Sequence, residues 1–496
     1  MQDVLLLLAW LPLARAEGCS AQIAPLLSLA ESPSATEEDA LSSITPLLPQ
    51  LSLTPTPSAA ELIANRQPTL LKGTTVDIWP ASSWSWRMLS SVLANESLAG
   101  VASLHGHLYA PVDKRAALDP LLRYPSTHEL KNMSGSEFFR AVEQAGEEST
   151  HASYRHSPLS SAGSHRGWRA SKQRLVHFSE VPSRIRKFLE PQEWMYPHSD
   201  DAKARMQYMW LSTPGVRTHT HFDSDPNFFV QLIGRKRFVL WAPNQSATMC
   251  PFPRLHPLWH KSRADFEKPD LTVPSCERYN ESIAVVVEVN PGDVLFVPQF
   301  WWHTVETLSP SPSLSLSTLS RWPQLYIHLN AIYSHNYFFD QLRSYSSRLY
   351  ALRLFLVQLM KKAGGDVGGT APIISAIRRQ YAGFESLFER APDDEQQLCV
   401  IDDRGTPTCR NCLARTSFDV MLVWDEHLTR LPADVRAIVL SEFIEEVTNS
   451  TVGISKTLPF WERCFEEQPF FLTQPGLSEH IELWQEGSAD IEIDSD

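Results

Sequence analysis

The chain has 496 residues, of which 43% are hydrophobic and 20% are charged, and its formal net charge is −13. This length suits one large domain with an extension, or two domains. The composition is that of a folded globular protein, which excludes wholesale disorder. An acidic chain without a basic run is not built for general binding to nucleic acid or anionic lipid, because both are polyanions. No nucleic-acid partner is therefore expected.

The first 16 residues are typical of a secretory signal peptide. Val4 to Leu13 is a short apolar stretch, and Ala14-Arg15-Ala16 has the small-x-small form of a cleavage site. A helix of the mature protein is the alternative, but the segment 17–60, rich in Ser, Thr and Pro, offers it no packing partner. No later apolar run reaches the roughly 18 residues of a transmembrane helix. We therefore expect a signal peptide at 1–16, a leader at 17–60, no transmembrane segment, and a protein of the endoplasmic reticulum lumen or one that is secreted.

Two further patterns bear on the secretory route. Cys399, Cys409 and Cys412 lie close together in a turn-rich stretch. A disulfide-closed hairpin is favoured there over a zinc site, because one Cys-x-x-Cys without a second pair is weak evidence for zinc. Asn-x-Ser/Thr sequons, which make the chain a candidate glycoprotein, occur at Asn95, Asn132, Asn244, Asn280 and Asn449.

Ordered structure is expected to begin near Arg66, where residues 68–73 predict a strand that ends in a turn. A helix is predicted over 134–145, because Ser134 and Glu137 have the spacing of a capping box. Between 206 and 322, short strand-like runs follow one another, and Pro291-Gly292-Asp293 marks a turn between two of them. Such runs indicate a sandwich or jelly roll and not a parallel sheet. The predicted strands of this part are 207–212, 228–232, 237–241, 284–289, 294–298 and 314–319.

Beyond Trp322 the apolar residues recur with a helical period. Pro372 and Pro432 are each predicted to open an amphipathic helix. We therefore expect a helical C-terminal extension over 323–496, with an acidic tail. Its apolar stripes fit a homodimer interface, a lid over a substrate site and packing against the β domain equally well.

The run Thr218-His219-Thr220-His221-Phe222-Asp223 predicts a metal site. Side chains two apart on a strand share a face, so His221 and Asp223 are expected to bind one metal ion, and His219 is interpreted as structural. His303, just after the strand 294–298, is a candidate third ligand. Two histidines and one carboxylate leave three positions open on an iron ion for a bidentate co-substrate and dioxygen. Zinc is usually satisfied by three ligands and water, so the triad alone leaves both metals open.

The text around the triad resembles the JmjC, or cupin-like, oxygenases, which use Fe(II), 2-oxoglutarate and dioxygen. The resemblance is dense over 206–322 and looser from about residue 66; among the members, the chain most resembles the asparaginyl hydroxylase that inhibits hypoxia-inducible factor. It implies a mainly β fold over 61–322, a double-stranded β-helix (jelly roll) with flanking helices and an α-helical C-terminal extension. The matching text is His221-Phe222-Asp223, Asn227 to Arg237, Pro291 to Pro298 and Trp301-Trp302-His303.

The resemblance implies a role for each matching residue at the metal. His221, Asp223 and His303 match the iron ligands. Lys236 matches the lysine that pairs with the distal carboxylate of 2-oxoglutarate, and Thr218 matches the threonine whose hydroxyl binds the same carboxylate. The alternative for Lys236 is a solvated lysine in a Gly-Arg-Lys-Arg turn, and its register relative to His221 favours the ligand role.

Further matches and departures concern the rest of the pocket. Asn227 matches an asparagine near the metal, with a turn residue as an equal alternative. Trp322 matches a tryptophan of the substrate pocket, with core packing at least as well supported. Val176 occupies the position of a tyrosine that binds the co-substrate, and Ser320 that of an asparagine. Both departures shorten or remove polar groups near the 2-oxoglutarate or the substrate.

These interpretations predict a 2-oxoglutarate-dependent dioxygenase that hydroxylates a protein or peptide side chain in the secretory pathway. A scaffold protein that keeps the fold without turnover is the main alternative, motivated by Val176 and Ser320. A zinc cupin enzyme leaves Lys236 unexplained, and a signal peptide with a negative net charge argues against histone demethylation.

Overall fold

We describe the protein from a computed structural model. The described residues are 50–52, 59–104, 128–150, 174–182, 205–308 without positions 255, 257, 267, 268 and 274, 313–320, 370–384 and 431–461, with single residues at 185, 195, 352 and 356. The predicted signal peptide, Cys399, Cys409, Cys412, Trp322 and the acidic tail lie outside them.

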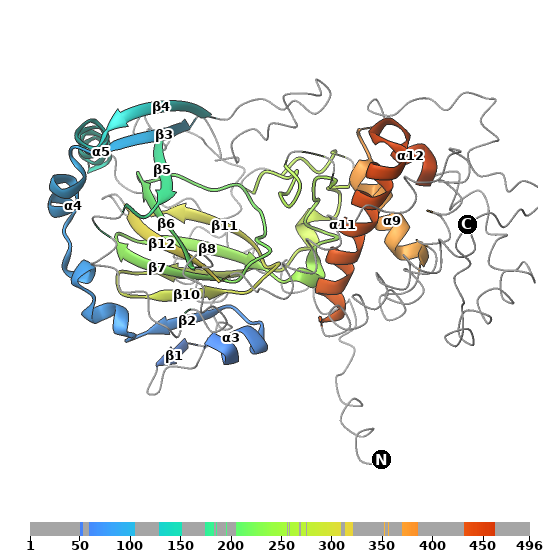
Figure 1. Ribbon diagram of the computed structural model, residues 1–496, viewed down its shortest axis with the longest axis horizontal. Coiled ribbons are helices and arrows are strands. Elements are labelled where there is room, and N and C mark those ends of the chain that lie inside the picture. The colour runs from blue at the N-terminus through green and yellow to red at the C-terminus, as the bar shows by residue number, and fades with distance from the viewer. Residues whose placement is uncertain are drawn as a thin grey trace, which may run out of the picture.

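Two antiparallel sheets form the body of the molecule, with helices at both ends of the view in Figure 1. The strands are β1 Gln50–Ser52, β2 Thr69–Lys72, β3 Ser97–Leu104, β4 His128–Ser134, β5 Arg174–Glu180, β6 Arg205–Ser212, β7 Asn227–Ile233, β8 Lys236–Trp241, β9 Val285–Val289, β10 Val294–Val297, β11 Trp302–Thr307 and β12 Ser313–Ser320. The helices are α3 Ala59–Asn65, α4 Trp86–Leu93, α5 Gly135–Thr150, α9 Thr370–Tyr381, α11 Ala433–Val452 and α12 Ile454–Trp461, with short 3-10 turns η1 Thr75–Ile78, η2 Pro80–Ser83, η6 Pro243–Gln245 and η7 Tyr279–Glu281.

The larger sheet has the order β1-β2-β10-β7-β12-β6-β5-β3-β4, and the smaller one has the order β11-β8-β9. Within the described residues, only the short β1–β2 pair is parallel. Neighbours in the strand order are often distant in sequence, as β10 beside β7 and β12 beside β6 are, which is the pattern of a jelly roll and not of a meander. The expected mainly β jelly roll with flanking helices is confirmed.

A layer of aromatic and aliphatic side chains fills the space between the two sheets. The Phe229 ring of the larger sheet lies edge-on to the Phe238 ring of the smaller sheet, with 4.7 Å between centroids. Both belong to a buried cluster that includes Leu240 of β8 and Leu295 of β10. Side chains alternate along each strand, so this core marks which residues of β7, β8 and β11 point inward. On β8 these are Lys236, Phe238 and Leu240, a face that β11 continues with His303, Val305 and Thr307.

Local sequence signals place most of these elements correctly. Five of the six strands predicted over 206–322 agree with the structure within one residue at either end, and the sixth, 207–212, begins two residues after the start of β6. The capping box is also present: the Ser134 backbone N–H donates to the Glu137 carboxylate at 2.7 Å, and the Glu137 N–H donates to the Ser134 hydroxyl at 3.2 Å. This hydrogen bonding lowers the pKa of Glu137. The one strand of this part without a sequence prediction is β11.

The C-terminal helices pack against the β domain. Pro432 is the residue before α11, as predicted, whereas α9 begins at Thr370, two residues ahead of the predicted Pro372. The contact is made by the loop that follows η6: the Arg254 backbone N–H donates to the Glu445 carboxylate of α11 at 2.9 Å. The Tyr381 hydroxyl of α9 donates to the same carboxylate oxygen at 2.8 Å. Of the three roles expected for the helices, packing against the β domain is the one visible here.

Burial of Glu445 makes this junction sensitive to pH. Glu445 is 1% exposed, and desolvation raises its pKa to about 8, from 4.5 in the unfolded chain. The folded state then binds more protons than the unfolded state between these values, so stability falls as pH rises through this window. We expect the melting temperature of Glu445→Gln, measured by calorimetry, to fall less between pH 5 and pH 8 than that of the wild type. The matched control is Glu446→Gln in the same helix, which should keep the wild-type difference.

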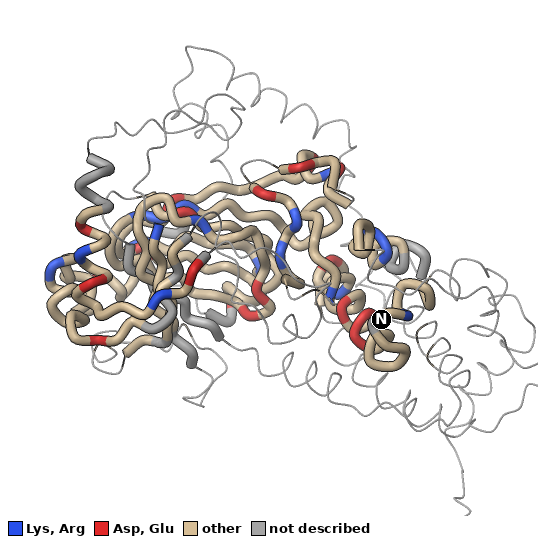
Figure 2. The backbone as a smooth tube through the Cα atoms, turned by 90° about the horizontal axis from the view of Figure 1, so that it is seen from above, with Lys and Arg blue, Asp and Glu red and all other residues tan. Residues whose placement is uncertain are grey.

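Two global properties of the described part complete the fold. No described helix is long and apolar enough to cross a bilayer. Figure 2 shows acidic and basic residues interspersed along the backbone, without a broad basic face.

Candidate metal centre

His221, Asp223 and His303 come together at one end of the smaller sheet. One donor atom from each lies within 4.8 Å of the other two. The Asp223 carboxylate lies 3.9 Å from Nε2 of His221 and 3.7 Å from Nε2 of His303. The side chain of His303 is 5% exposed, that of His221 18% and that of Asp223 38%, so the centre is open on the carboxylate side. The structure therefore confirms that the three predicted ligands meet.

The backbone that carries the ligands differs from the prediction. The continuous strand expected through 218–223 is wrong: His221 makes isolated bridges, and Asp223 lies in the loop after it. His221 exchanges two backbone hydrogen bonds with His303, of 3.0 and 2.7 Å. The Asp223 carbonyl accepts from the Phe300 N–H at 2.8 Å, which ties the loop to the start of β11. Tertiary hydrogen bonds therefore orient the Asp223 carboxylate. The alternation of side chains along a strand, which was expected to orient it, does not.

Hydrogen bonds to backbone carbonyls define the tautomer of both histidines. Nδ1 of His221 lies 2.7 Å from the His219 carbonyl, and Nδ1 of His303 lies 2.9 Å from the Trp301 carbonyl. A carbonyl can only accept, so each Nδ1 carries a hydrogen and Nε2 is the nitrogen left to bind a metal. Desolvation, helped by the neighbouring His303, lowers the pKa of His221 well below its usual range. Neutral imidazoles with free Nε2 atoms are the form that binds metal.

Lys236 is buried in the same interior. It is 4% exposed and lies opposite Thr307, on the face of the smaller sheet that also carries His303. Its ammonium lies 5.3 Å from the Phe229 ring centroid and 5.9 Å from that of Trp210. Desolvation lowers the pKa of Lys236 to about 7. The interpretation as a solvated turn lysine is therefore wrong, and a buried cation faces the core beyond the metal ligands.

The structure also places Thr218, Asn227, Val176 and the backbone of Ser320. The Thr218 hydroxyl accepts from the Val305 N–H of β11 at 2.9 Å. Asn227 is buried at the start of β7, so the turn alternative is wrong. Val176 packs with Val216 and Trp210. The surface is therefore apolar at the position where the family resemblance would place a tyrosine hydroxyl. Ser320 is the last residue of β12, and Trp322 lies outside the described residues.

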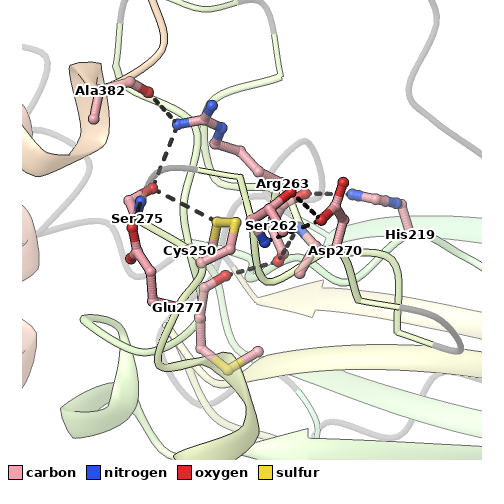
Figure 3. Close-up of a disulfide and its surroundings, with 12 residues drawn as sticks. His219, Cys250, Ser262, Arg263, Asp270, Ser275, Glu277 and Ala382 are labelled. Atoms are coloured by element: carbon pink, nitrogen blue, oxygen red, sulfur yellow. Dashed lines mark hydrogen bonds between the residues drawn. A yellow bond between two sulfur atoms is a disulfide. The ribbon is translucent and has the colours of Figure 1, made fainter.

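Three other residues around the triad have structural roles. The His219 ring faces the Ser262 carbonyl, as expected of a structural histidine (Figure 3). Trp302 is fully buried and donates from Nε1 to the Ser246 hydroxyl at 2.8 Å. Trp301 donates to the Arg66 carbonyl at 3.2 Å. Core packing is therefore the role of both tryptophans.

Sequence reasoning missed one cation at the centre, Lys261. Lys261 forms a bridge with His221 on the side away from His303 and is 6% exposed. Desolvation lowers its pKa to about 8, and the charge of Asp223 opposes that shift. The bridge joins residues 40 positions apart, and no local pattern marks it, so only the tertiary structure reveals this neighbour.

The donor set fits a divalent metal ion. Two neutral imidazole nitrogens and one carboxylate oxygen converge, as in the facial triad of Fe(II) oxygenases. A jelly roll with this triad inside it is the arrangement of cupin-type proteins. A family model for the cupin-like domain matches residues 55–344, which is more than half of the chain, and the chain belongs to this family.

Relatives among known proteins include one that is named for a JmjC domain. JmjC domain-containing protein D of Dictyostelium discoideum is 31% identical over 105 residues, 21% of this chain and 23% of that protein. Lysine-specific demethylase JMJ31 of Arabidopsis thaliana is 26% identical over 129 residues, 25% of this chain and 23% of that protein. HSPB1-associated protein 1 of Rattus norvegicus is 33% identical over 108 residues, 21% of each chain. Each similarity thus spans less than a quarter of the relative's length.

Proposed function

We propose that the protein is an Fe(II)- and 2-oxoglutarate-dependent dioxygenase that hydroxylates a protein or peptide side chain. The observation that carries the proposal is that two sites share one interior face. One is His303 of the triad, whose Nε2 is left to bind a metal, and the other is the buried cation Lys236. A carboxylate bound between the metal and Lys236 would offset the desolvation of this buried ammonium. We include in this proposal the expectation that the protein resembles the asparaginyl hydroxylase named above.

The proposed roles of the residues follow from their positions. His221, Asp223 and His303 hold Fe(II), which supplies the oxidising chemistry with dioxygen when bound. Lys236 and the Thr218 hydroxyl hold the distal carboxylate of 2-oxoglutarate, so its keto acid end reaches the metal. Phe229, Phe238 and Val305 exclude water between the two ends. These residues sit on strands or are hydrogen-bonded to them, which gives the precision that the reaction requires.

One observation favours a second candidate, a scaffold without turnover. Val176 packs with Val216 and with Trp210, whose ring lies near the Lys236 ammonium, and it offers no hydroxyl group to a carboxylate there. Binding of 2-oxoglutarate separates the two functions. Calorimetry of the full chain loaded with Mn(II) should show stoichiometric binding of 2-oxoglutarate for an oxygenase. No binding at millimolar co-substrate would favour the scaffold.

The activity itself is tested by release of succinate from 2-oxoglutarate with Fe(II) and dioxygen. We expect slow succinate release without substrate and faster release with a peptide substrate. Mass spectrometry of secretory proteins incubated with the active chain should show +16 Da products, as expected for one added oxygen atom. Methylated lysine peptides serve as the demethylase arm, since one relative has that name. Absence of metal-dependent succinate release under all conditions would refute the proposal.

A secretory location is part of the proposal. Cys250 and Cys276 form a disulfide that the sequence did not indicate, and disulfides persist in oxidising compartments. Four sequon asparagines are exposed: Asn95, Asn132, Asn244 and Asn280. Asn449 is 9% exposed, and its side-chain carbonyl accepts from the Thr457 hydroxyl between α11 and α12.

The exposure of the sequons predicts where glycans are attached. We expect N-linked glycans on several of the four exposed asparagines and none on Asn449, because a glycan there would separate two packed helices. The measurement is glycopeptide mass spectrometry of the protein secreted from eukaryotic cells, with Asn-to-Gln variants as controls. An unglycosylated protein with reduced Cys250 and Cys276 would contradict the secretory location.

A further inference from the structure

A short backbone segment continues the smaller sheet past the metal ligands. β11 pairs with β8 on one side, and His303 of β11 bridges to His221 on the other. His221 in turn bridges to Lys261, with flanking hydrogen bonds from Phe222 N–H to the His260 carbonyl at 3.1 Å and from Ser262 N–H to the Thr220 carbonyl at 2.9 Å. Directly opposite residues of an antiparallel pair project to the same face. Lys261, His221 and His303 therefore stand in one row.

This geometry places a second cation beside the triad, apart from Lys236. Lys236 lies opposite Thr307, four residues beyond His303 along β11, which is about 13 Å of strand. Lys261 is the neighbour of His221 on the side away from His303. The two cations thus lie on different sides of the centre. One bound 2-oxoglutarate that reaches Lys236 leaves Lys261 available for another molecule.

The surroundings of the Lys261 ammonium bear on its role. Among the described residues, none accepts a hydrogen bond from its ammonium, and no carboxylate lies within ion-pairing distance of it. Asp223 is the acidic group whose charge acts on it, but Asp223 is committed to the metal when the centre is loaded. Within the described residues, the donors of the Lys261 ammonium thus remain available to a bound carboxylate.

The segment that carries Lys261 is held from several directions. His260, the preceding residue, has a left-handed backbone with φ of 56°, which a non-glycine residue adopts only when its surroundings enforce it. Figure 3 shows the neighbouring clamp: the Cys250–Cys276 disulfide lies beside Arg263, which donates to the Ala382 carbonyl after α9 at 2.7 Å. The Ser262 hydroxyl donates to the Met249 carbonyl at 2.7 Å. Contacts with both the β domain and the C-terminal helices therefore hold the backbone around Lys261 in place.

We propose that Lys261 is a substrate-positioning residue that binds a carboxylate of the substrate, so that the oxidised side chain belongs to an acidic residue or lies next to one. This inference rests on the proposed oxygenase function and names its substrate class, an acidic peptide. The ammonium donates to the carboxylate and directs the adjacent C–H bond toward the open side of the metal. The C-terminal helices contribute by holding the segment that presents Lys261.

The test uses the full chain loaded with Mn(II) and 2-oxoglutarate without dioxygen. The probes are three acetylated hexapeptide pools that differ only in a central Asp, Asn or Leu. Broadening of the central side-chain proton signals by Mn(II) reports proximity to the metal and needs no turnover. We expect the Asp pool to be broadened most. In Lys261→Met, the affinity for the Asp pool should fall at least tenfold, and Lys261→Arg should retain part of that affinity. Lys131→Met, at an exposed lysine of β4, is the matched control and should behave as the wild type.

Two results would overturn the inference. One is equal broadening of the Asp and Leu pools by the wild type, or no broadening of any pool. The other is an Asp preference that survives in Lys261→Met. The affinities for Mn(II) and 2-oxoglutarate, measured by calorimetry on the same samples, separate this failure from that of the proposed function. If both bind normally while the peptide preference is absent, only the role of Lys261 is wrong; if neither binds, the oxygenase itself is refuted.

Discussion

Replacement of Lys236 by methionine should abolish binding of 2-oxoglutarate and at the same time raise the melting temperature. The ammonium is the buried cation that would pair with the distal carboxylate, so its loss should weaken binding at least about 100-fold, since breaking a buried charge pair costs several kcal/mol. Desolvation lowers the pKa of this lysine to about 7, from 10.5 in the unfolded chain. The unfolded state binds the extra proton between these values, so the buried lysine costs stability that diminishes as pH rises. Methionine fills a similar volume without that cost.

Calorimetry measures both consequences on one variant. We expect the melting temperature of Lys236→Met to exceed that of the wild type by at least about 3 °C at pH 6.5, and by less at pH 9. Lys131→Met, in which an exposed ion pair with Glu129 is lost, should leave the affinity and the melting temperature nearly unchanged. A variant that binds 2-oxoglutarate normally would contradict the assigned role of Lys236. A variant with a lower melting temperature would contradict the desolvation argument.

Replacement of His221 by alanine should remove metal binding and every metal-dependent activity. Nε2 of His221 is one of three converging donors, and the ring is oriented by its Nδ1–H contact with the His219 carbonyl. Loss of a metal ligand is at least as severe as loss of a residue that only hydrogen-bonds to a ligand. We therefore expect the affinity for Mn(II) to fall about 100-fold or more. Electron paramagnetic resonance titration of Mn(II) measures the affinity directly, without an assay of turnover.

A matched control for this variant is His177→Gln. His177 is also buried, and desolvation lowers its pKa to about 4, but its Nε2 contacts the Ser179 hydroxyl on β5 and lies outside the triad. The control should bind Mn(II) as the wild type does. Equal loss of Mn(II) binding in both variants would point to a general effect on folding, and unchanged binding in His221→Ala would refute the metal site.

The parts of the fold that follow from short-range pattern were predicted well. β7, β8 and β10 are runs of apolar residues between clear turns, and Pro291-Gly292-Asp293 separates β9 from β10. The Ser134–Glu137 capping box needs only residues three apart, and it forms as expected. β11 was missed because Trp302–Thr307 mixes aromatic, histidine and hydroxyl residues, and these find their partners only across the sheet.

The sequence by itself determined the type of fold, the three candidate metal ligands and the lysine on the same interior face as His303, because turns, apolar runs and a dense motif are local features of the sequence. Only the tertiary structure decided which residues surround that centre. The bridge from His221 to Lys261, the disulfide between Cys250 and Cys276 and the contact of Glu445 with Arg254 join positions separated by 26 to 191 residues. Such contacts depend on how the sheets and helices close upon one another, and this closure is a property of the whole packed chain that no short stretch encodes.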